Sequence, residues 1–134
     1  MTKKKDIVTS GMRKRAVARA VLTPGKGMVR INGVALDSFE PKLARLKLQE
    51  PLFLVDDIAK TVHIDITVSG GGFLSQVEAA RVAMCRALSQ QGGVKVRKSL
   101  VDYDRSFLVP DTRRKETRKP NDSKARAKRQ KSYR

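Results

Sequence analysis

The hydrophobic pattern of this chain changes its period near the middle. Residues 61–68 alternate strictly between apolar and polar side chains, which predicts a β-strand with one buried face. After three glycines, apolar residues recur every three to four positions from Phe73 to Leu88. This pattern predicts an amphipathic helix of roughly 16 residues that ends at Gln91-Gly92-Gly93. A shorter helix is expected from Val94 to about Tyr103.

The N-terminal part predicts a short strand and a basic hairpin. Ile7–Thr9 suits the short strand, which Ser10-Gly11 should end. Residues 13–22 read as a longer strand with Pro and Gly after it, so that residues 28–31 return as its partner. One side of the longer strand is small and mostly apolar, and carries Lys14, Ala16, Ala18, Ala20 and Leu22. The other side carries Arg13, Arg15 and Arg19, which we expect to face phosphate, with Lys26 at the basic tip.

The remaining pattern predicts one more helical stretch and a segment without a core. A helix should begin near Asp37-Ser38, with Pro41 in its first turn, and Glu50-Pro51 should break or kink it. Residues 111–134 contain no Val, Ile, Leu, Met or Phe, so they can bury nothing and should be disordered when free. We therefore expect an α/β core over residues 1–110 and a tail over 111–134.

The distribution of charge agrees with this division. The 134 residues include 30 Lys and Arg and 13 Asp and Glu, a formal charge of +17. Residues 1–30 carry +8, residues 31–110 carry +1 and residues 111–134 carry +8. A charge-balanced body with basic ends favours a polyanionic partner, and nucleic acid, above all folded RNA, fits best.

Other features narrow the class of protein. No apolar run is long enough to cross a bilayer, and the basic ends lack an amphipathic stripe, so we expect no membrane partner. The N-terminus lacks the apolar stretch of a secretory signal. Cys85 is the only cysteine, which excludes an intrachain disulfide and favours a reducing compartment.

Residues that could carry chemistry are few. The three glycines could be a simple strand-to-helix connector or a contact for RNA phosphate, but the Walker and dinucleotide-binding patterns both fail around them. His63 and Asp65 lie on one strand face and could suggest a metal or acid-base pair, but a solvated polar face is the better explanation. Cys85 is best explained as a small core residue. We therefore expect no catalytic site, no metal site and no cofactor.

The tail carries clustered cations that suit RNA. Arginine makes bidentate phosphate contacts and stacks on bases, and 24 extended residues would reach ~80 Å. A solubilising tail is the alternative explanation.

Residues 70–88 and 125–134 carry a resemblance to a known family. The chain resembles the universal small-subunit ribosomal proteins of the S-nine family, in their archaeal or eukaryotic branch. The motif comprises Gly70, Gly71, Gly72, Ser75, Gln76, Ala79, Ala83, Arg86, Ala87 and Leu88. The branch is indicated by residues 48–51, 103–105, 111–116 and 130–134.

The resemblance implies a fold and a set of partners. The fold is α+β: a two-layer domain with a four-stranded mixed sheet, a left-handed crossover and an extended C-terminal tail. The expected role is a structural constituent of the small ribosomal subunit in the cytoplasm. There the protein would bind ribosomal RNA in the subunit head, contact neighbouring head proteins, and touch the anticodon stem-loop of peptidyl-site tRNA with its tail.

These expectations assign particular residues. The residues predicted to bind ribosomal RNA are Arg13, Lys14, Arg15, Arg19, Lys26, Gly70, Gly71, Gly72, Gln76, Arg113, Arg114, Lys115, Arg118, Lys119, Arg126 and Lys128. Those predicted to bind tRNA are Arg129, Lys131 and Arg134.

Two other functions share some of these features. A general nucleic-acid compaction protein would share the charge but bind DNA and RNA alike. A small-molecule kinase could share the architecture but would have to bind nucleotide.

Overall fold

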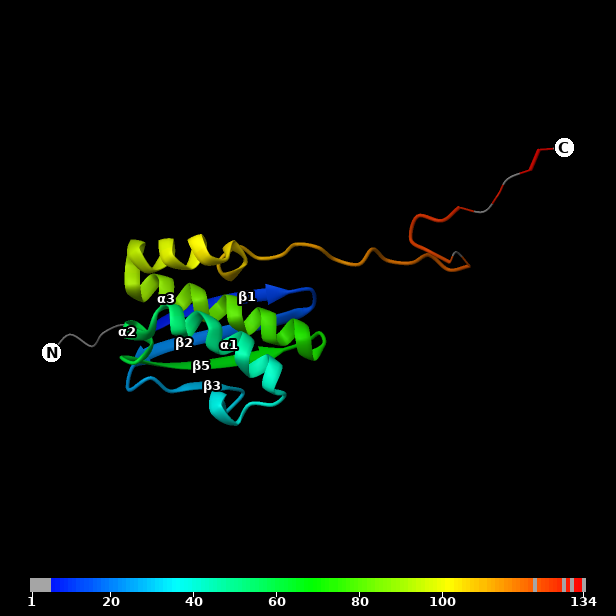
Figure 1. Ribbon diagram of the computed structural model, residues 1–134. Coiled ribbons are helices and arrows are strands. Elements are labelled where there is room, and N and C mark those ends of the chain that lie inside the picture. The colour runs from blue at the N-terminus through cyan, green and yellow to red at the C-terminus, as the bar shows by residue number, and fades with distance from the viewer. Residues whose placement is uncertain (1–5, 122, 129, 131, 134) are drawn as a thin grey trace.

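The core is a two-layer α+β domain in which the helices cover one face of a single sheet (Figure 1). The computed structural model describes residues 6–121, 123–128, 130, 132 and 133. The sheet has the order β1-β2-β5-β3-β4, with strands β1 (Ile7–Arg13), β2 (Ala16–Pro24), β3 (Val29–Ile31), β4 (Val34–Ala35) and β5 (Val62–Ser69). The helices are the 3-10 turns η1 (Leu36–Ser38) and η2 (Arg105–Phe107), and α1 (Lys42–Leu54), α2 (Asp56–Ala59) and α3 (Phe73–Tyr103).

Alternation of side chains explains the buried face of the sheet. Apolar residues at every second position of β2 and β5 are buried, as the sequence predicted, and their polar neighbours face solvent. The buried residues of β2 are mostly alanines, and those of α3 include Ala79, Ala80, Ala83 and Ala87. Small side chains on both sides let α3 lie close to the sheet. The buried Thr9 hydroxyl also donates a hydrogen bond to the Ala83 carbonyl, 2.7 Å away.

The predicted hairpin between residues 13–22 and 28–31 is wrong. The hairpin is instead formed by β1 and β2, which pair from Ile7↔Leu22 to Arg13↔Ala16 around the two-residue turn Lys14-Arg15. β5 lies between β2 and β3, antiparallel to the first and parallel to the second. β5 is thus the central strand of the sheet, and its apolar face is buried throughout its eight residues. β1 is also longer than predicted, because Gly11 is buried rather than a break.

The sheet has five strands where four were predicted. The fifth is the two-residue strand β4, which returns from β3 through Asn32 and Gly33, both with positive φ. The connection from β3 to the parallel strand β5 runs through α1 and α2. The left hand of this crossover stays a prediction of the resemblance.

The helices differ from the sequence expectations at two places. Asp37 and Ser38 do not cap a helix but lie in η1, and α1 begins at Lys42 after Pro41. The expected break at Glu50-Pro51 is not observed: Pro51 lies inside α1, which continues to Leu54, and the Pro51 ring is buried. The predicted division near Gly92-Gly93 is confirmed, since Gly93 leaves the helical conformation with φ 67° and splits α3 into residues 73–92 and 94–103.

The second half of α3 closes a small secondary core. Leu100 and Phe107 are fully buried there with Cys85, and Val55 joins them. Beyond this point, the described residues from 111 onward contain no helix or strand, and the ribbon runs away from the core (Figure 1).

Candidate nucleic-acid interface

The three glycines lie beside the turn of the β1–β2 hairpin. Because β5 pairs antiparallel with β2 as far as Val17↔Ser69, the residues after β5 come next to Arg15. Gly70 and Gly71 have φ of 74° and 65°, a conformation that favours glycine. A Cβ on Gly70 would lie 2.6 Å from the Arg15 carbonyl oxygen, and one on Gly71 would lie 2.8 Å from the Ala16 nitrogen. The glycines therefore bring the loop into contact with the basic turn.

Gln76 holds this loop in place. Its side-chain Nε2 donates a hydrogen bond to the Gly70 carbonyl at 3.1 Å, and its backbone N–H donates to the Gly72 carbonyl at 3.0 Å. Gly72 is the residue before α3 and provides no side-chain cap, so N–H groups of the first helical turn remain for another acceptor. Such N–H groups favour anions.

An ion-pair cluster fixes the root of the tail to the core. Arg13 lies 2.7 Å from a Glu78 carboxylate oxygen on α3 through its Nε, and 3.2 Å from Asp111 through Nη2. Asp111 also accepts hydrogen bonds from the side chain and backbone of Arg113. These hydrogen bonds hold the pKa of Asp111 well below its usual range, so this carboxylate stays ionised.

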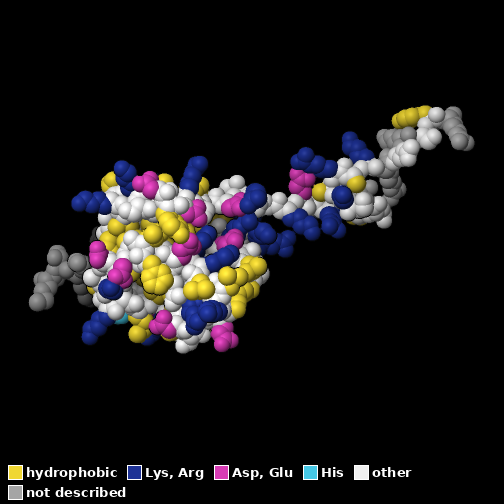
Figure 2. Space-filling view, viewed as in Figure 1, with side chains coloured by type: hydrophobic (Ala, Val, Ile, Leu, Met, Phe, Trp, Pro, Cys, Tyr) yellow, Lys and Arg dark blue, Asp and Glu magenta, His cyan; other side chains and the backbone are white. Residues whose placement is uncertain are grey.

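The turn, the glycine loop and the tail root together surround an open hollow of about 610 Å³. We call it the glycine-loop hollow; its lining residues are Lys14, Arg15, Gly71, Gly72, Ser75, Arg114 and Lys115. Among the described residues, four cations and no carboxylate line it, and Ser75 adds a hydroxyl. Lys and Arg side chains gather where the tail leaves the core and continue along the tail (Figure 2). This combination of cations and backbone N–H groups suits a phosphate chain.

The structure separates other residues that the sequence grouped together. Arg13 does not share the solvent face with Arg19, because it pairs with Ala16 on the helix side of the sheet. Lys14 is not on an inward strand face; it is exposed in the hairpin turn with φ 52°. Arg19 is exposed on the open face of the sheet, and Lys26 lies at the opposite end from the glycine loop, since its turn contacts Thr61 and Val62.

The predicted tail residues differ in their surroundings. Arg118, Lys119 and Lys128 are exposed, whereas Arg126 is hydrogen-bonded to Glu116, with Nε 2.9 Å from Oε2. The three residues predicted to bind tRNA, Arg129, Lys131 and Arg134, lie outside the described residues. Two residues of the interface were missed: Ser75, although it belongs to the glycine motif, and Asp111, which only the fold brings to Arg13.

The arrangement offers binding groups rather than reactive ones. Burial raises the pKa of the Cys85 thiol to about 12, so it stays protonated. The His63 Nδ1 accepts a hydrogen bond from the Met28 backbone N–H at 3.2 Å and is thus part of the strand contacts. Across the part of the chain that the structure describes, no three His, Cys, Asp or Glu residues gather closely enough to hold a metal ion. No helix in these described residues combines the length and apolarity that crossing a bilayer requires.

Fold and interface together define a small basic α+β protein whose charged surface suits a polyanionic partner. The family model described as ribosomal protein S9/S16 matches residues 11–134, so the chain belongs to this family. It is also 46% identical over 129 residues to the small ribosomal subunit protein uS9 of Pyrobaculum aerophilum. The aligned region covers 96% of this chain and 91% of that protein. The predicted family is thereby confirmed. Members are structural ribosomal proteins, so this protein is not an enzyme.

Proposed function

We propose that this protein is a structural constituent of the small ribosomal subunit in the cytoplasm and binds ribosomal RNA in the subunit head. The glycine-loop hollow is the observation that carries the proposal, because four cations meet there without a neutralising carboxylate among its described lining residues. Basic side chains release counterions from closely spaced phosphates and so permit RNA segments to pack together. The charge-balanced core orients the basic segments, and these make the contacts.

The tail extends the same interface beyond the core. The Arg13–Asp111 ion pair directs the first tail residues past the glycine-loop hollow, where Arg114 and Lys115 contribute to it. The following residues add further cations with no apolar core to retain them. We infer that residues up to Lys128 follow ribosomal RNA, and that the last residues reach the anticodon stem-loop of peptidyl-site tRNA.

Removal of residues 129–134 tests both parts of this proposal. The full chain should remain with small subunits through a high-salt wash, and the shortened chain should remain equally well because the core and the rest of the tail are intact. Peptidyl-site tRNA should dissociate roughly tenfold faster from the shortened subunits, since three cations near its phosphates are lost. Subunit pelleting and filter binding of labelled tRNA measure the two quantities.

A control with Gln130→Ala and Ser132→Ala keeps every cation of this segment. It should hold tRNA as the full chain does. Unchanged tRNA dissociation after the removal would refute the tRNA assignment alone. Loss of the full chain in the wash, or equal affinity for duplex DNA and ribosomal RNA at physiological salt, would refute the ribosomal assignment and favour a compaction protein.

The α1 region has a different character that suits a protein partner. Leu43, Leu46 and Phe53 are exposed on α1, Phe53 to 74%, and residues 32–61 carry a net charge of −1 in a chain of +17. A nearly neutral surface with exposed apolar side chains suits a protein partner better than phosphate. We propose that this surface contacts a neighbouring protein of the subunit head through these apolar side chains.

Phe53→Gln should leave the melting temperature of the free protein within about 2 °C, because the ring is already exposed. The variant should nevertheless be lost from small subunits at a lower salt concentration than the unchanged protein. Leu54→Gln, at a position exposed to only 39%, serves as the comparison. Equal retention of Phe53→Gln and the unchanged protein across the salt series would remove the proposed contact.

A further inference from the structure

A second polar hollow lies along the free edge of β1, away from the glycine loop. It has a volume of about 520 Å³, and its polar lining includes Ser10, Arg86, Ser89, Gln90 and Arg97. Among the described residues, no Asp or Glu lines it. We call it the edge hollow. Ser10 is four residues from Lys14, or about 14 Å along an extended chain, so the two hollows are separate.

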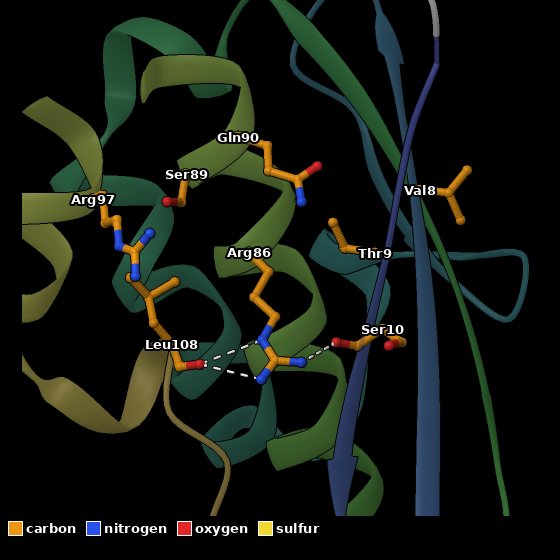
Figure 3. Close-up of a pocket in the computed structure, with 8 residues that line it drawn as sticks. All are labelled: Val8, Thr9, Ser10, Arg86, Ser89, Gln90, Arg97 and Leu108. Carbon is orange, nitrogen blue, oxygen red and sulfur yellow. Dashed lines mark hydrogen bonds between the residues drawn. The ribbon is translucent and has the colours of Figure 1, made fainter. Parts of the chain in front are cut away.

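Arg86 is held rigidly at the floor of the edge hollow. Its Nη1 donates to the Ser10 carbonyl at 2.7 Å, and its Nε and Nη2 both donate to the Leu108 carbonyl at 3.3 Å (Figure 3). These bonds join β1, α3 and the end of η2. A guanidinium has five N–H donors, so two remain after these three bonds. Its plane and direction are thus fixed before any ligand arrives.

Arg86 differs from Arg13 and Arg81, because those two arginines are paired with carboxylates and Arg86 is not paired with any carboxylate of the described residues. Arg13 lies beside Glu78 and Asp111, and Arg81 lies 3.4 Å from Glu50. Among the described residues Arg86 donates hydrogen bonds only to backbone carbonyls, which orient it without cancelling its charge. An oriented, half-buried cation with spare donors favours an anionic ligand.

Arg97 supplies a second cation from another direction. It projects from the second half of α3 toward the hollow, while Arg86, Ser89 and Gln90 come from the first half (Figure 3). Gly93, which reverses the chain between the two halves, is what brings these side chains together. Arg97 is exposed and has no carboxylate partner within the described residues.

We propose that the edge hollow binds a phosphate of the RNA backbone, gripped between Arg86 and Arg97, with Ser89 and Gln90 as additional hydrogen-bond donors. Arg86 fixes the position of the phosphate, and Arg97 closes over it. This inference rests on the proposed RNA-binding function and adds a contact on the opposite end of β1 from the glycine-loop hollow.

Arg97→Gln tests the proposal in the full chain, because the residue is exposed and the fold should not change. A transcript of the small-subunit ribosomal RNA serves as the probe, with binding measured over a range of salt concentrations. We expect Arg97→Gln to weaken binding roughly five- to tenfold at ~0.1 M salt and to lower the salt slope by about 0.7–0.9, as for one lost phosphate contact.

Lys98→Gln is the matched control, since it removes the same charge from the adjacent residue, which does not line the hollow. It should weaken binding no more than about twofold and leave the slope almost unchanged. Equal effects of the two variants would overturn the proposal, while failure of the unchanged protein to bind the transcript would instead refute the proposed function.

A final arm separates RNA phosphate from free phosphate. Binding is repeated in roughly 10 mM inorganic phosphate and in chloride of equal ionic strength, so that general screening is the same in both buffers. The difference between Arg97→Gln and the unchanged protein should persist in both buffers. Its disappearance in phosphate alone would show that the hollow holds a free anion, which contradicts the proposal.

Discussion

Replacing the four cations of the glycine-loop hollow by glutamine is expected to weaken binding to small-subunit ribosomal RNA by roughly 10²- to 10³-fold at ~0.1 M salt. The four residues are Lys14, Arg15, Arg114 and Lys115. Each phosphate contact releases condensed counterions, so the slope of log affinity against log salt should fall by about 3. All four side chains belong to exposed residues, so the variant should fold.

The matched control removes four other cations from the same chain. It carries glutamine at Lys42, Lys47, Lys95 and Lys98, which do not line the glycine-loop hollow. Both variants lower the formal charge from +17 to +13, so they share any effect of total charge. The control should retain most of the affinity and of the salt slope in filter binding. Equal losses in the two variants would show that overall charge, and not this hollow, governs binding.

The clearest parts of the fold were those where one periodicity persists over many residues. The alternation of β5 fixed both its existence and its buried face, and the spacing from Phe73 to Leu88 did the same for the first half of α3. The end of the first helix at Gly92-Gly93 was also predicted, because a glycine there can adopt the positive φ that ends a helix. These features depend on local chemistry, which the sequence displays directly.

The pairing of the strands could not be read in the same way. The Pro- and Gly-rich segment after β2 resembled a hairpin turn, yet β5 separates β2 from β3. The true hairpin turn, Lys14-Arg15, contains neither glycine nor proline, and Lys14 takes a positive φ of 52° without the usual residue types. Which strand occupies the centre of a sheet depends on burial across the whole domain, and local turn residues do not determine it.

The candidate interface shows the same division between local and long-range information. The glycine motif and the basic clusters were visible in the sequence, and the structure brings the motif to Lys14 and Arg15 on one side and to Arg114 and Lys115 on the other. The strand face of Arg13 was predicted wrongly, because the two-residue turn changes which face of the sheet it occupies. Its carboxylate partners come from α3 and the tail, so only the fold could reveal them.

Gly11→Ala should strongly destabilise the core, because α3 lies directly against β1 at this position. A Cβ on Gly11 would approach the Ala83 nitrogen to 2.6 Å and the Ala79 carbonyl oxygen still more closely. Both are backbone atoms of a helix, so neither can rotate away, and α3 would have to move from the sheet. We expect the free energy of unfolding to fall by roughly 3 kcal/mol and the Tm by roughly 10–20 °C, measured by urea and thermal denaturation.

Ser10→Ala provides the comparison on the same strand, because the Ser10 side chain is exposed on the opposite face of β1. This substitution should lower the free energy of unfolding by less than about 0.5 kcal/mol. A second comparison distinguishes backbone from side-chain crowding. Ala83→Gly removes a side chain but leaves the crowded nitrogen in place, so it should not rescue Gly11→Ala in a double-mutant cycle. A favourable coupling of more than about 1 kcal/mol would show that side chains, rather than the helix backbone, set the distance between α3 and the sheet.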